Sequence, residues 1–189
     1  MHTSPHITPP SLPPRLSLTG LVKLVLEDRA SNLGEWSYPG FQALLGYRLA
    51  CYSQGLRPGV LRRTVGGLQR RLQRRVARRY GIRIDRSATV GRRVRLIHQS
   101  AITIHPGTVI GDDCWLRQGA TLGSAWASAA EAPTLGRDVR LGANVVIEGS
   151  TCVGDSVRIG PNCVVVEDVQ DGMSVFPARC RVVIDQQPQ

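Results

Sequence analysis

The sequence of 189 residues has few aromatic rings and no long apolar run. Aromatic residues make up 5% of the chain, which leaves few large side chains to fill one thick core and favours a fold of thin layers. No apolar stretch approaches the roughly 20 residues that a membrane-spanning helix requires. The first residues also contain no apolar segment that resembles a signal peptide. We therefore expect a cytoplasmic protein.

The cysteines lack the pattern of a disulfide framework or a zinc site. There are five of them, an odd number, and no pair has CxxC spacing. We expect them to be reduced and to pack as small hydrophobic residues. His98 and His105 stand seven apart with no third histidine ligand nearby, so we expect no metal site.

Lysine is almost absent, yet the net charge is +10. Between Arg57 and Arg95 there are 14 arginines against one acidic residue, Asp85, whereas residues 96–189 carry more acidic than basic residues. The arginines fit a solvated helix face, contact with an anionic membrane or a lipid-phosphate-linked glycan, or nucleic-acid binding. Aromatic residues do not alternate with them as single-stranded nucleic-acid binding would favour, so we expect no nucleic-acid partner.

Composition and periodicity divide the chain into four parts. Residues 1–15 are proline-rich and are predicted to be a disordered tail. Residues 16–80 are predicted to form three helices, the first capped by Ser17 or Thr19, the second starting at the Pro39-Gly40 turn, and the third amphipathic and basic. Residues 81–183 form the main domain and 184–189 a second tail.

A six-residue period dominates residues 81–183. An aliphatic residue recurs every six positions, and a small residue or glycine often follows it. A helix has no such period, so the pattern predicts a parallel β-helix of triangular section, in which three hexads complete one coil. The predicted inward residues are Ile84, Val90, Leu96, Ile104, Ile110, Leu116, Leu122, Leu135, Leu141, Ile147, Val153, Ile159 and Val165.

Two interruptions break the period. Leu96 and Ile104 are eight apart, which places a two-residue insertion beside His98. Leu122 and Leu135 are 13 apart, which places the loop 124–133 outside the wall. Binding sites are usually built where a regular scaffold is interrupted.

Several motifs follow one another along the chain: GFQALLGYR at 40–48, RLIHQSAITIHPGTVIGDD from Arg95, RQGATLG at 117–123, the hexads, and VFPAR at 175–179. In this order of motifs the chain resembles the serine acetyltransferases among the hexapeptide-repeat acyltransferases. The resemblance implies a mainly β fold, a left-handed parallel β-helix preceded by an α-helical segment. It also implies a homotrimer with active sites between neighbouring prisms, and in some members a dimer of trimers.

The chemistry implied by the resemblance is acetyl transfer from acetyl-CoA, a co-substrate rather than a bound cofactor, to a hydroxyl. His98 aligns with the family's catalytic histidine, and such a base must remove the proton of the attacking hydroxyl. The backbone of Thr121, Gly123 and Ser124 is expected to stabilise the oxyanion. The pantetheine arm is expected to pass Gly123, Gly142 and Ala143.

Several positions depart from the family pattern. Arg83 stands where the family carries the aspartate that orients the histidine, Ile97 where an aspartate usually precedes it, and Glu131 where the loop usually has an Arg-His pair. Asp85 lies two residues from Arg83, on the same side of a strand, and is a candidate substitute. Trp126 is a candidate lining residue of the substrate groove.

The sequence therefore leaves three functions open. The first is serine O-acetylation, which gives O-acetylserine for cysteine synthesis. The second is O-acetylation of a sugar hydroxyl in glycan synthesis, which the altered pocket positions suit equally well. The third is a catalytically silent prism that serves as a scaffold.

Overall fold

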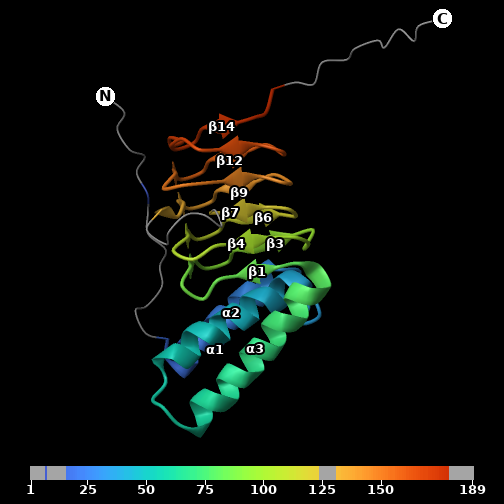
Figure 1. Cartoon of the computed structure of the whole chain (residues 1–189), viewed down its shortest axis with the longest axis vertical. Coiled ribbons are helices and arrows are strands. Elements are labelled where there is room, and N and C mark those ends of the chain that lie inside the picture. Colours follow the sequence, from blue (N-terminus) through green and yellow to red (C-terminus); the bar gives the residue numbers. More distant parts are fainter. Residues whose placement is uncertain (1–6, 8–15, 124–130, 179–189) are drawn as a thin grey trace, which may run out of the picture.

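A computed structural model describes residue 7 and residues 16–123 and 131–178. It consists of a layer of three helices at one end of a stack of β-coils (Figure 1). The predicted tails and most of the predicted outer loop lie outside the described residues. The division of the chain into four parts therefore stays a prediction.

The three predicted helices are confirmed. They are α1 (Leu18–Ser31), α2 (Pro39–Gly55) and α3 (Val60–Tyr80). The Ser17 side chain caps α1 by accepting a hydrogen bond from the Gly20 amide, 3.0 Å away. Gly81 ends α3 in the left-handed conformation, with φ 69°. None of the helices in the described part of the chain is long and apolar enough to cross a membrane.

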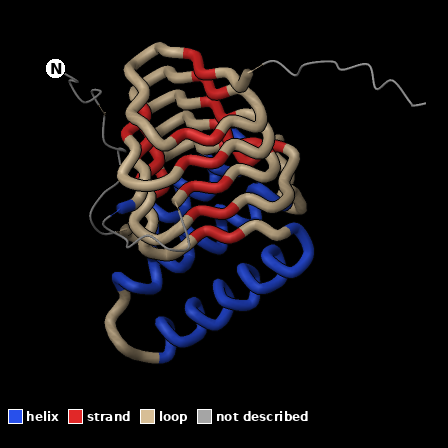
Figure 2. The backbone as a smooth tube through the Cα atoms, turned by 45° about the horizontal axis from the view of Figure 1, so that its top comes forward, coloured by secondary structure: helices blue, strands red, loops and turns tan. Residues whose placement is uncertain are grey.

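The rest of the described chain is a left-handed parallel β-helix with three faces. Each of the first four coils contributes one short strand to each face, the last coil adds only an isolated bridge to the second face, and every strand pair is parallel. Figure 2 shows the strands stacked along the prism. The first face has the order β1 (Arg83–Ile84), β4 (Thr103–Ile104), β7 (Thr121–Leu122), β10 (Val146–Ile147), β13 (Val164–Val165).

The other two faces follow the same rule. The second has the order β2 (Thr89–Val90), β5 (Val109–Ile110), β8 (Thr134–Leu135), β11 (Cys152–Val153). The third has the order β3 (Arg95–Ile97), β6 (Trp115–Arg117), β9 (Arg140–Leu141), β12 (Arg158–Ile159), β14 (Ser174–Val175).

The predicted inward residues form the core. Those from Val90 to Val165 are buried, and they stack because the register pairs each with its counterpart one coil on, as Ile104 pairs with Leu122. Ile84 in the first coil is half-buried. Thin aliphatic layers therefore replace the aromatic core that this composition cannot supply.

Tight contacts between coils account for the glycines that follow inward residues. A Cβ on Gly111 would lie 2.3 Å from the carbonyl oxygen of Gly136 in the next coil, and one on Gly136 would lie 2.8 Å from the amide nitrogen of Asp155. Neither backbone can yield without breaking the ladder. The glycines of the hexads are thus a packing requirement at the corners.

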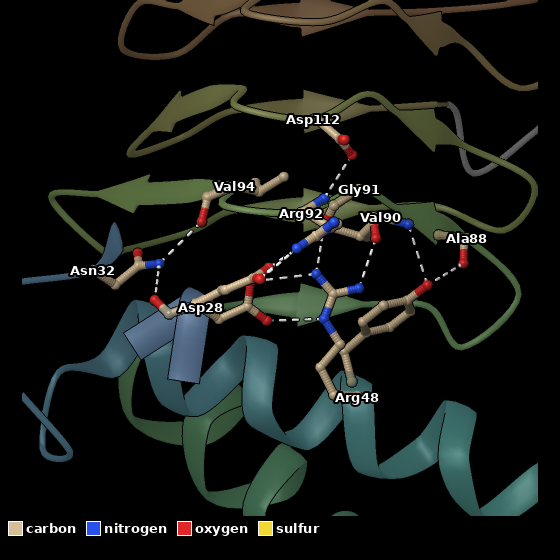
Figure 3. A network of polar contacts seen from close by, with 11 residues as sticks. Asp28, Asn32, Arg48, Ala88, Val90, Gly91, Arg92, Val94 and Asp112 are labelled. Carbon is tan, nitrogen blue, oxygen red and sulfur yellow. Dashed lines mark hydrogen bonds and ion pairs between the residues drawn. The ribbon is translucent and has the colours of Figure 1, made fainter. Parts of the chain in front are cut away.

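Side chains of α1 and α2 cover the first coil (Figure 3). Arg48 donates to the carbonyl oxygens of Val90 and Gly91 at 2.6 and 2.5 Å. Tyr47 donates to the Ala88 carbonyl and accepts from the Val90 amide. These bonds satisfy backbone groups that have no coil beneath them.

Two further side chains complete this cover, which we call the helical cap (Asp28, Asn32, Tyr47 and Arg48). Asp28 accepts from Arg48 Nε at 2.8 Å, and both side chains are 1% exposed. Asn32 donates to the Val94 carbonyl at 2.9 Å and accepts from the Leu96 amide at 3.0 Å. The cap thus holds both the second and the third strand of the first coil.

Replacing Arg48 by methionine should strongly destabilise the protein. Asp28 would stay buried without its counter-charge, and the Val90 and Gly91 carbonyls would lose their donor. Breaking a buried ion pair costs about 3–5 kcal/mol of unfolding free energy. Urea denaturation at fixed protein concentration measures this loss.

Arg93→Met is the matched control, because Arg93 pairs with Asp113 at 2.6 Å on a surface where both side chains are over a third exposed. Such exposed pairs contribute at most about 1 kcal/mol. Equal losses in the two variants would show that the buried pair has no special part in stability.

Candidate active site

His98 lies at the corner between β3 and β4, where the sequence predicts an insertion. Its side chain is exposed and its φ is 53°, in the left-handed region. Ala101 (φ 52°) occupies the same corner position as Gly119 (φ 73°) and Asn144 (φ 57°) in later coils, so one such residue per coil is normal at this edge of the prism. His98 is an additional one, and a non-glycine residue held there signals local strain, which is typical of functional sites.

The insertion leaves the stacking on either side intact. Leu96 pairs with Leu116 before the corner, and Ile104 pairs with Leu122 after it. The extra residues are therefore pushed outward, and the imidazole is presented at the surface of the prism. Ile97, which precedes it, is half-buried and pairs in register with Arg117.

Gln118 is a candidate that the sequence reasoning missed. Its side-chain oxygen Oε1 is buried and has no hydrogen-bond donor among the described residues. The residue lies one coil on from the His98 corner, since the amide of its neighbour Gly119 donates to the Ser100 carbonyl. The RQGATLG motif contains Gln118 and could have pointed to it, but only the structure shows that its Oε1 atom accepts no hydrogen bond from the described residues.

The Thr121 and Gly123 amides, which the sequence predicts as oxyanion donors, form hydrogen bonds within the β-helix. The Thr121 amide donates to the Val145 carbonyl at 2.9 Å, and the Gly123 amide donates to the Ile147 carbonyl at 2.8 Å. Both amides are thus committed to the next coil rather than directed at a ligand. Ser124 and Trp126 lie outside the described residues, and their predicted roles are not tested.

Gly123, Gly142 and Ala143, the predicted contacts of the pantetheine arm, also take part in packing and hydrogen bonding between coils. Gly123 has φ 95°, and a Cβ there would lie 2.6 Å from the Cβ of His105. The Gly142 amide donates to the Ile159 carbonyl, and a Cβ on Gly142 would lie 2.5 Å from the Pro161 nitrogen. Ala143 accepts from the Asn162 amide at 2.8 Å. Packing between coils already explains both glycines, and their predicted contact with the cofactor arm stays a prediction.

Asp85 is not brought to His98 by any contact within the described chain. Its carboxylate accepts from the Ser87 amide at 2.8 Å and from the Ser87 hydroxyl at 2.7 Å. It follows β1, at one end of the first face, whereas His98 precedes that face from the opposite corner. The role of Asp85 as an orienting carboxylate stays a prediction, and its carboxylate has a different partner in this structure.

Asp85 instead shares a pocket of about 530 Å³ with His105 and Arg83. The pocket lies between α3 and the first face, with Arg74 and Arg78 at its helical side. The sequence itself indicates that Asp85 and His105 are neighbours, because each follows an inward residue of the hexad pattern. The structure pairs those two inward residues, Ile84 and Ile104, in register. Glu131, at the end of the outer loop, is exposed and lines no part of this pocket.

The described cysteines are not activated nucleophiles. Burial raises the pKa of the Cys114 thiol to about 12, and burial raises that of Cys51, Cys152 and Cys163 as well. A thiol with a raised pKa is a poor nucleophile at neutral pH. All four are free thiols, as the sequence predicts, and no group of three metal-ligating side chains occurs in the part of the chain that the structure describes.

The hexads and the fold agree with comparisons to known proteins. A family model described as bacterial transferase hexapeptide (six repeats) matches residues 132–167. Serine acetyltransferase 1 of Entamoeba histolytica superposes with a TM-score of 0.68 at 26% identity, over 85% of this chain and 64% of that one.

Two curated relatives match along nearly their whole length. A serine acetyltransferase of Helicobacter pylori is 34% identical over 173 residues, covering 89% of this chain and 97% of the relative. The putative colanic acid biosynthesis acetyltransferase WcaB of Escherichia coli is 32% identical over 162 residues, covering 85% and 99%. The chain therefore belongs to the serine acetyltransferase family of hexapeptide-repeat acyltransferases.

Proposed function

We propose that this protein transfers the acetyl group of acetyl-CoA to the hydroxyl of L-serine, with His98 as general base. Family membership at 34% identity over nearly the full length of a serine acetyltransferase supports the reaction. The observation that carries the catalytic assignment is the outward insertion that holds His98 exposed, with φ 53°, between two undisturbed stacks.

The proton balance requires one base. His98 takes the proton from the acceptor hydroxyl as its oxygen attacks the thioester carbon, which forms the new C–O bond. The tetrahedral intermediate then expels the CoA sulfur, the C–S bond breaks, and the imidazolium returns the proton to the thiolate. No covalent enzyme intermediate is needed, which fits the raised pKa values of the described thiols.

A homotrimer would complete this site. His98 is exposed in the single chain, whereas acyl transfer needs a site from which water is excluded. The Thr121 and Gly123 amides are committed to the next coil, so part of the oxyanion stabilisation must come from Ser124 or from a neighbouring prism. We propose that the active site lies between subunits of a cytoplasmic trimer.

A second acceptor class is favoured by the positions that depart from the family pattern. Arg83, Ile97 and Glu131 stand where the family resemblance implies other side chains, and the similar WcaB is named as a putative colanic acid biosynthesis acetyltransferase. A sugar hydroxyl, part of an uncharged and larger acceptor, would use the same base. The carboxylate that orients the imidazole would then be absent or be replaced by Asp85.

Replacing His98 by alanine should lower kcat/KM by about 10²–10⁴-fold, which is the usual contribution of a general base. Thiol release from acetyl-CoA measures the rate, and light scattering checks that the assembly persists. His105→Ala is the matched control, because it removes the other imidazole of the prism; we expect a much smaller loss. Full activity of the His98 variant would reject the assignment of the base.

The acceptor can be identified with the same thiol assay. We expect faster release with L-serine than with a panel of nucleotide sugars and neutral oligosaccharides at equal concentration. The reverse order would establish the sugar-hydroxyl function. An assembled protein that releases no thiol with any acceptor would establish the scaffold.

A further inference from the structure

The outer face of α3 carries positive charge that the described chain does not neutralise. Its eight arginines are all exposed, and none forms an ion pair with a described carboxylate. The helix itself contains no acidic residue. These arginines are Arg62, Arg63, Arg70, Arg71, Arg74, Arg75, Arg78 and Arg79.

Several arginines of the β-helix, in contrast, form ion pairs with carboxylates of the chain. Arg92 pairs with Glu27, Arg137 with Asp155, and Arg158 with Asp138. A base composition that favours arginine would scatter it without regard to partners, yet five of the nine described arginines of the β-helix form ion pairs with described carboxylates and none of the eight on α3 does. The difference points to a partner for α3 outside the chain.

The arginine face is hollowed and flanked by apolar side chains. Five of its arginines and Gly67 line a shallow depression of about 590 Å³. Leu61 and Leu68 are 60% and 59% exposed, and Leu68 lies three residues before Arg71 and so shares its side of the helix. We call this surface, from Leu61 to Arg79, the α3 docking face.

The docking face lies mainly on the solvent side of α3, and its Arg74 and Arg78 also line the pocket between α3 and the first face of the β-helix. α2 packs against α3 on the inner side, and in Figure 1 α3 is the outermost helix at the end of the molecule opposite the C-terminal coils. Contact through this face would therefore leave the His98 corner uncovered. Prisms assembled side by side would present several such faces at one end.

We propose that the α3 docking face binds the surface of an anionic lipid bilayer. Arginines interact with lipid phosphates, and the exposed leucines enter the interfacial region, as in peripheral amphipathic helices. This combination favours lipid over RNA, because the one aromatic residue of α3, Tyr80, is half-buried against the core and no exposed ring stands among the arginines to stack on bases. The chain would bind at the surface without crossing the membrane.

The test is co-sedimentation of the full-length protein with phosphatidylglycerol vesicles in 0.1 M salt, with phosphatidylcholine vesicles as reference. We expect binding to the anionic vesicles only, and weaker binding as salt increases. The variant Arg71→Gln/Arg75→Gln should bind about 30-fold more weakly, since each basic residue near such a surface contributes about 1 kcal/mol and 1.4 kcal/mol is tenfold.

The matched control is Arg137→Gln/Arg140→Gln, which removes the same charge from exposed positions on the prism. It should bind as the unmodified protein does. Leu61→Ser/Leu68→Ser should weaken binding without changing its salt dependence, and circular dichroism verifies that each variant is folded.

Three results would overturn the proposal. They are no sedimentation with anionic vesicles, equal losses in the two arginine pairs, and tighter binding per unit charge to an RNA homopolymer than to the vesicles. Because none of these readouts depends on acetyl transfer, the proposal and the enzymatic function fail independently.

Discussion

The open end of the β-helix is the constraint on which the structure depends. Every other coil hydrogen-bonds to a coil below it, but the first one has backbone groups facing nothing. The helical cap satisfies them through Tyr47, Arg48 and Asn32, with Asp28 compensating the buried guanidinium. An uncapped end would be a template for pairing with other chains, so the helices also keep the solenoid from stacking end to end. The motif GFQALLGYR thus has a physical basis: its Gly40 allows a close approach to Leu96, and its Arg48 closes the coil.

The fold was largely predictable because its period is a local property. An aliphatic residue every six positions identifies each inward residue, and the structure buries those from Val90 onward as expected. The helices were equally readable from apolar spacing and from Pro39 and Gly81. The helical cap was not predictable, because nothing in a single segment shows that Asp28 and Arg48, 20 residues apart, meet beneath strands that begin far downstream.

The site was predictable only where it coincides with a break in the period. His98 was identified by its insertion and by resemblance, and the structure adds its left-handed backbone. The ligand contacts of Gly123 and Gly142 were inferred from the family resemblance, yet close packing of coils by itself requires glycine at both positions. Asp85 was proposed as a partner of His98 because side chains alternate along a strand. Alternation predicts which side of the strand a side chain lies on but not which end of the strand it is near, and the Asp85 carboxylate accepts from Ser87 instead. The free acceptor of Gln118 depends on burial, which no pattern reveals.

The corner at His98 has a consequence for how such a protein can change. Register is restored within one strand after the insertion, as the pairing of Ile104 with Leu122 shows, and again after the longer loop, where Leu135 pairs with Ile110. The core is therefore insulated from the length and composition of its corners. The stacked layers thus accommodate a two-residue insertion at one corner and a longer interruption at another without a change of register. A relative named as a serine acetyltransferase and one named as a putative colanic acid biosynthesis acetyltransferase keep a similar identity to this chain.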